Sequence, residues 1–72
     1  MESSVKKIHQ DGLEISLMDG SKWKIKNIGD MTRTILWYPT QHIKVEEKGD
    51  GEFTLTNLNT SAPDEIEVSR IR

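Results

Sequence analysis

The chain has 72 residues, of which 33% are hydrophobic and 31% are charged, and its formal net charge is −2 at pH 7. This length predicts one domain with a small core. The sequence contains no cysteine, which excludes disulfides and thiolate metal sites. Basic and acidic side chains are nearly equal in number, which argues against nucleic acid or a membrane surface as the main partner.

No apolar run reaches the length of a membrane span, and no signal peptide is visible in the sequence. The chain as written therefore fits the cytoplasm. A periplasmic or secreted location is expected if an export signal precedes Met1 in the natural gene product.

The first predicted strand covers residues 4–10 and is followed by Asp11-Gly12, a strong signal for a two-residue hairpin turn. This turn places Ile8 opposite Ile15. Val5 is then expected on the other face of the strand.

The next two strands alternate strictly between apolar and polar residues on both sides of Gly20. A two-residue loop between them would turn the lysines of the second strand toward the core, because a slip of one residue flips a whole strand. A three-residue loop instead pairs Ile15 with Trp23 and Glu14 with Lys24. We therefore predict a type I turn with a bulge, in which Gly20 has a positive φ.

A break at Gly29-Asp30 follows, and residues 31–33 are compatible with a single helical turn. Residues 34–38, with the sequence TILWY, are β-branched and aromatic, which predicts a strand. Pro39 ends that strand or marks it as an edge.

Three more strands are predicted over residues 42–46, 52–58 and 65–71. The odd-length turn Gly49-Asp50-Gly51 joins the first two and places Lys48 opposite Glu52. Residues 59–64 form a loop by composition. The side chains expected to point inward are Ile43, Val45, Phe53, Leu55, Ile66 and Val68.

Six or seven short strands with closely spaced hairpin turns indicate an all-β protein. We predict a small antiparallel meander over residues 1–72 that closes into an SH3-like or OB-like barrel. Closure is expected because a flat sheet would leave two unpaired edges.

The only histidines, His9 and His42, are both expected on solvent faces. A catalytic pair is conceivable, but a cross-strand partner such as Glu14 for His9 is the simpler interpretation, since small sheets rarely enclose the pocket that catalysis needs. The acids around Gly51 lack the ligand spacing of a calcium loop. The sequence therefore predicts no enzyme, no metal site and no cofactor.

Lys22, Lys24 and Lys26 share one face of a strand and could follow a phosphate backbone. Small barrels bind single-stranded nucleic acid by combining such a row with exposed aromatic side chains. The alternative is a solubilising face, partly neutralised by Glu14. We favour this alternative because the overall charge is balanced.

The consecutive residues Trp37, Tyr38 and Pro39 form a second candidate binding site. An exposed aromatic ring beside a proline can anchor a partner. The alternative is that Trp37 fills the barrel and Tyr38 closes one end, which suits a small core that needs its large residues. Because the two aromatic residues are adjacent, one of them is expected to point outward.

The sequence resembles a group of small, uncharacterised bacterial β-domain proteins over about residues 11–60. The resemblance implies a small barrel with no assigned activity, often made with an export signal, and it provides no catalytic residues. The residues that carry it are Asp19, Gly20, Ser21, Trp23, Trp37, Ile43, Val45, Leu55 and Asn57.

These patterns predict a non-enzymatic interaction module that binds a protein partner or itself. The contact would be made through an exposed strand edge or through Trp37, Tyr38 and Pro39. The alternative is a single-stranded nucleic-acid binder that uses Lys22, Lys24 and Lys26 together with Tyr38.

Overall fold

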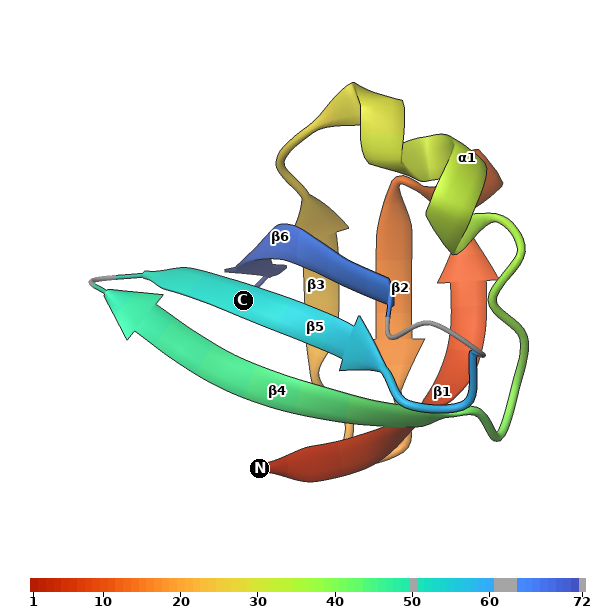
Figure 1. The fold of residues 1–72 in the computed structure, drawn as a ribbon, viewed down its shortest axis with the longest axis horizontal. Helices are drawn as coiled ribbons and strands as arrows, with labels where there is room; N and C mark the ends of the chain where they lie inside the picture. Colours follow the sequence, from red (N-terminus) through yellow and green to blue (C-terminus); the bar gives the residue numbers. More distant parts are fainter. Residues whose placement is uncertain (50, 61–63, 72) are drawn as a thin grey trace.

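The computed structural model describes residues 1–49, 51–60 and 64–71. This part of the chain forms six strands and three short helical segments (Figure 1). The strands are β1 (Glu2–His9), β2 (Glu14–Leu17), β3 (Lys22–Ile25), β4 (His42–Gly49), β5 (Glu52–Asn57) and β6 (Asp64–Ile71). The helical segments are η1 (Gln10–Gly12), η2 (Ile28–Asp30) and α1 (Met31–Thr34).

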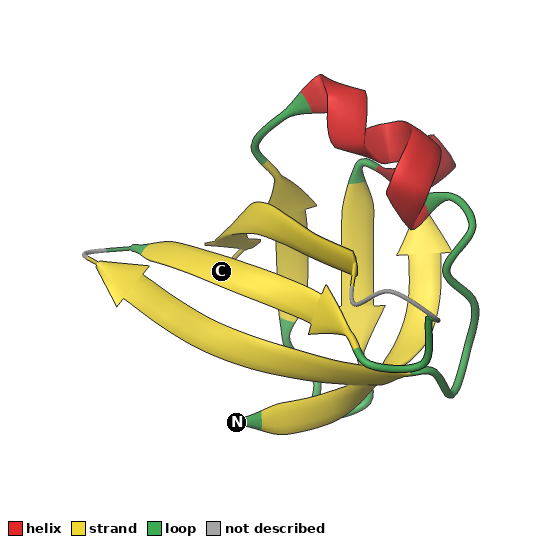
Figure 2. Ribbon diagram, viewed as in Figure 1, coloured by secondary structure: helices red, strands yellow, loops and turns green. Residues whose placement is uncertain are grey.

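The strands close into an antiparallel barrel in the order β1-β2-β3-β6-β5-β4, which confirms the predicted small all-β barrel. Two three-stranded meanders replace the single meander of the prediction. The long connection after β3 brings β4 back beside β1, which is the order of a Greek key. The helical segments of this connection lie across one end of the barrel (Figure 2).

The second hairpin has the predicted register, with Ile15 opposite Trp23 and Glu14 opposite Lys24. Its turn has Gly20 at a φ of 91°, as the three-residue loop requires. The inward side chains of both meanders form one core, against which Phe53 packs from a half-buried position. The fully or nearly buried apolar residues are Val5, Ile15, Leu17, Trp23, Ile25, Trp37, Ile43, Val45, Leu55, Ile66 and Val68.

The prediction for Val5 was wrong, because its side chain is completely buried. Val5 pairs with Leu17 and Lys7 pairs with Ser16, so β1 contains one extra residue, Lys6, at a bulge. A bulge shifts the alternation of a strand by one residue. As a result Val5 and Ile8 both reach the core, and Lys6 and Lys7 are both exposed.

The β4–β5 hairpin also contains a bulge, at Lys48. Glu52 lies opposite Gly49, so the predicted pairing of Lys48 with Glu52 was wrong. Asp50, in the predicted turn, and residues 61–63, in the predicted loop, lie outside the described residues.

The predicted strand over residues 34–38 was also wrong. Thr34 ends α1, and the chain continues in turns to Gln41, with Leu36 and Trp37 donating backbone hydrogen bonds to the carbonyls of Arg33 and Thr34. The tertiary contacts of Thr34 and Trp37 outweigh the β-propensity of the sequence. Residues 31–33, which the sequence left compatible with a single helical turn, lie in α1.

Candidate functional site

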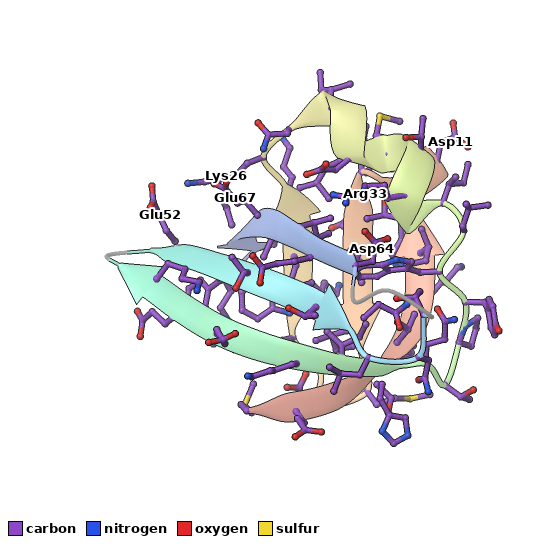
Figure 3. The ribbon with its side chains drawn as sticks, viewed as in Figure 1. Asp11, Lys26, Arg33, Glu52, Asp64 and Glu67 are labelled. Atoms are coloured by element: carbon purple, nitrogen blue, oxygen red, sulfur yellow. The ribbon has the colours of Figure 1, made fainter. Side chains whose placement is uncertain are left out.

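Trp37 anchors the connection between α1 and β4 on the barrel through core packing and a hydrogen bond. Its side chain is 4% exposed and belongs to the core. The indole Nε1 donates a hydrogen bond of 3.1 Å to Asp64 Oδ2 at the start of β6. Arg33 of α1 forms an ion pair with the other oxygen of the same carboxylate, at 2.9 Å (Figure 3). A single acid therefore holds both the helix and the segment that follows it.

Further polar contacts fix the backbone on both sides of Trp37. The buried Thr34 hydroxyl donates a 2.7 Å hydrogen bond to the carbonyl of Gly12 in the first turn. On the other side, the side-chain oxygen of Gln41 accepts hydrogen bonds from the Tyr38 backbone N–H at 3.1 Å and from Asn57 Nδ2 at 2.7 Å. These contacts make the connection part of the folded barrel and hold its backbone in one arrangement.

The side chains next to Trp37 point outward. Ile35 is 50% exposed, Leu36 is 74% exposed and Tyr38 is 62% exposed, and Pro39 is exposed as well. We call Ile35, Leu36, Tyr38 and Pro39 the apolar display. Tyr38 and Pro39 of the predicted site thus lie at the surface, whereas Trp37 is in the core.

Ile35 and Leu36 were not identified from the sequence as binding residues. A strand was expected there, and its alternation would have placed one of these two side chains inside. The signal that could have revealed them is the uninterrupted apolar run from Ile35 to Tyr38, because a single core residue leaves the others at the surface.

The predicted lysine row lies on the exposed face of β3. Lys26, just after the strand, forms a 3.0 Å ion pair with Glu52 of β5 (Figure 3). Lys24 lies opposite Glu14, which offsets its charge. Only Lys22 lacks an acidic cross-strand neighbour, since Ser16 and Ile71 lie beside it.

Lys22 instead joins two lysines of β1. It lines a surface hollow of about 270 Å³ whose wall also includes Lys6, Lys7, His9 and Ser16, and we call this the lysine hollow. The sequence did not reveal this grouping, because the bulge that turns Lys6 and Lys7 to the same side has no clear sequence signal. Positive charge therefore gathers across the strands rather than along β3.

His9 does not use its cross-strand neighbour Glu14 as a hydrogen-bond partner. Its Nε2 lies 2.9 Å from Ser16 Oγ. Among residues 1–49, 51–60 and 64–71, no three His, Cys, Asp or Glu side chains are grouped so that they could hold a metal ion. The helices in these same ranges are too short and polar to cross a membrane.

The geometry thus offers two surfaces for binding, the apolar display and the lysine hollow. Comparisons of the chain with protein-family models, with curated proteins and with solved structures find no match.

Proposed function

We propose that this protein is a non-enzymatic interaction module that binds an apolar segment of a protein through the apolar display. The observation that carries the proposal is the alternation at residues 36–38, where a buried tryptophan separates two strongly exposed apolar side chains. Protein-binding surfaces are enriched in aromatic and large apolar residues of this kind.

The rigid backbone supports this function. The contacts of Thr34, Trp37 and Gln41 hold the display in place before any partner arrives. A preorganised surface loses little conformational entropy on binding, so a few side chains can provide useful affinity. Three large apolar side chains exposed within four consecutive residues also raise the tendency of a small domain to associate, which fits a binding role.

Strand-edge pairing is the less favoured route to association. Closure of the barrel pairs β1 with β4 and β3 with β6. Within the part of the chain that the structure describes, the ladder from β4 to β1 stops at Val45, which bonds to Met1, so the end of β4 extends beyond it. That end carries Glu46, Glu47 and Lys48, and charged side chains protect an edge from pairing.

A selection from a displayed peptide library tests the proposal. Peptides are selected on the wild-type protein and then measured against the double variant Leu36→Ser/Tyr38→Ser. A matched control is Ile28→Ser, which changes another exposed apolar residue outside the display. We expect apolar peptides whose affinity falls at least about tenfold in the double variant and is unchanged in the control.

Sedimentation velocity over a range of concentrations shows whether a second copy is a partner. Concentration-dependent dimerisation that disappears in the double variant would identify self-association through the display. The proposal is wrong if no selected peptide distinguishes the double variant from the wild type and the protein also stays monomeric.

A further inference from the structure

We infer that the lysine hollow is a binding site for a phosphate group. Two lysines flank one serine across three neighbouring strands, because Lys7 of β1 and Lys22 of β3 both lie opposite Ser16 of β2. Adjacent strands are about 4.8 Å apart, so the two ammonium groups can reach one oxyanion above the serine. This site is independent of the apolar display.

The bulge in β1 supplies the third lysine. In a regular strand Lys6 and Lys7 would point to opposite faces. The extra residue leaves both of them exposed, and both line the hollow. Bulges commonly redirect side chains next to functional sites. Here the bulge concentrates three cations around one shallow depression.

Within the part of the chain that the structure describes, no ion pair holds these lysines. The ion pairs among the described residues involve Lys26, Arg33 and Lys44, and none involves Lys6, Lys7 or Lys22. Lys7 and Lys22 lie on either side of β2 with the uncharged Ser16 between them, so their charges repel each other across the hollow. The next row across the same strands is built differently, since His9, Glu14 and Lys24 place an acid at its centre.

Ser16 and His9 provide polar groups at the floor of the hollow. Ser16 is 6% exposed although its side chain lies on the outer face of β2, and it lines the hollow. His9 Nε2 is 2.9 Å from Ser16 Oγ. When this nitrogen carries the proton, His9 donates to the serine and leaves the hydroxyl proton free to point into the hollow. A hydroxyl donor surrounded by ammonium groups suits a phosphate oxygen.

Gly20 also lines the hollow, and the residue before it in the sequence is an acid, Asp19. Its Oδ1 accepts two hydrogen bonds from Ser21, from the backbone N–H at 2.9 Å and from the hydroxyl at 2.6 Å. Oδ1 of that carboxylate is therefore engaged within the turn, and Asp19 forms no ion pair with a lysine of the hollow among the described residues. Its single negative charge is smaller than the charge of the three lysines. The net charge of the hollow stays positive.

The test is an amide-shift titration of the ¹⁵N-labelled full chain with inorganic phosphate, with sodium chloride adjusted to keep the ionic strength constant. We expect saturable shifts centred on Lys7, Ser16, Gly20 and Lys22. The variants Lys7→Gln and Lys22→Gln are each expected to weaken binding by roughly tenfold, because each removes one charge-assisted hydrogen bond. The control Lys24→Gln, at the next outward position of β3, is expected to change the affinity by less than about twofold.

A second readout separates loss of the site from loss of the fold. Without phosphate, Lys7→Gln and Lys22→Gln should melt at or above the wild-type temperature, since each relieves repulsion between cations. With phosphate, the wild type should gain more thermal stability than either variant. A lower melting temperature for both variants without phosphate would contradict the inferred repulsion and overturn the site.

A single-stranded oligonucleotide of about eight nucleotides distinguishes a free phosphate from a nucleic-acid backbone. Shifts confined to the hollow with inorganic phosphate support the inference. Besides a lower melting temperature of both variants, two titration results would overturn it: the absence of saturation by inorganic phosphate, or equal weakening by Lys24→Gln and Lys22→Gln. Oligonucleotide shifts that extend to Lys24 and Lys26, without saturation by phosphate, would instead indicate binding of an extended strand.

Discussion

The indole of Trp37 and the carboxylate of Asp64 meet at a hydrogen bond of 3.1 Å between residues that are 27 positions apart in the chain. This bond joins the connection after α1 to the first residue of β6. The same carboxylate forms an ion pair with Arg33 at 2.9 Å. The connection therefore closes the barrel end as a fixed structure, and its outward side chains are available for binding.

The role of Asp64 predicts a clear loss of stability on truncation. The Asp64→Ala variant leaves the indole N–H of Trp37 without its acceptor. It also removes the 2.9 Å ion pair of Arg33, which keeps only its longer contact of 3.5 Å with Asp30 and its hydrogen bond to the Glu65 carbonyl. We expect the free energy of unfolding in urea to fall by about 1–3 kcal/mol. Glu67→Ala, at an exposed position of the same strand, should change it by less than about 0.5 kcal/mol. Similar effects of the two substitutions would rule out this role.

Gly12 is expected to be more sensitive to substitution than Gly20. Both have a positive φ, 101° and 91°, so alanine strains the backbone at either position. A Cβ at Gly12 would also lie 2.6 Å from Thr34 Oγ1 and 3.0 Å from the Met31 carbonyl, whereas a Cβ at Gly20 would meet nothing within 4 Å.

The clash at Gly12 must displace the connection, because the Thr34 hydroxyl is itself bonded to the Gly12 carbonyl. Gly12→Ala should therefore cost about 1–3 kcal/mol more than Gly20→Ala in the same unfolding measurement. Equal costs would mean that the first turn and α1 do not approach each other in the way described.

Asp19 gives a pH-dependent prediction. The hydrogen bond from the Ser21 hydroxyl, assisted by the Ser21 backbone N–H and the charge of Arg70, holds the pKa of the Asp19 carboxyl below its ordinary value of 3.8, although partial burial opposes this shift. A carboxyl with a lowered pKa in the folded state stabilises the fold above its unfolded pKa. That stabilisation is lost as the pH falls through the folded value.

The stability difference between wild type and Asp19→Asn should thus be constant from about pH 5 to pH 7 and should shrink as the pH drops below 3.8. Urea unfolding at a series of pH values measures it. A difference that grows toward acid pH would show that the carboxylate is not stabilised by the turn.

Local pattern was sufficient to predict the second hairpin. The register of Ile15 with Trp23 followed from the alternation of inward and outward side chains and from the need for a positive φ at Gly20. The same reasoning failed at Val5, because the bulge at Lys6 shifts the phase of β1 without a glycine or proline to signal it. The pairings of β1 with β4 and β3 with β6 depend on long-range packing, which the alternation of side chains along one strand cannot determine.

The two candidate surfaces were only partly predictable for the same reasons. The sequence predicted that one of Trp37 and Tyr38 would point outward, and the structure shows that it is Tyr38. The tertiary contacts of Thr34 and Trp37 replaced the expected strand and exposed Leu36 as well. Lys22 was found in its row, but its partners Lys6 and Lys7 became visible only with the bulge.

The most direct test of the proposed display is the free energy of urea unfolding of three single variants, Leu36→Ser, Trp37→Phe and Tyr38→Ser. The structure predicts that Leu36→Ser and Tyr38→Ser stay within about 0.5 kcal/mol of the wild type. Trp37→Phe should lose about 1–3 kcal/mol, because it removes a buried N–H donor and leaves part of the core unfilled. A loss of comparable size at Leu36 or Tyr38 would place these side chains in the core and contradict the display.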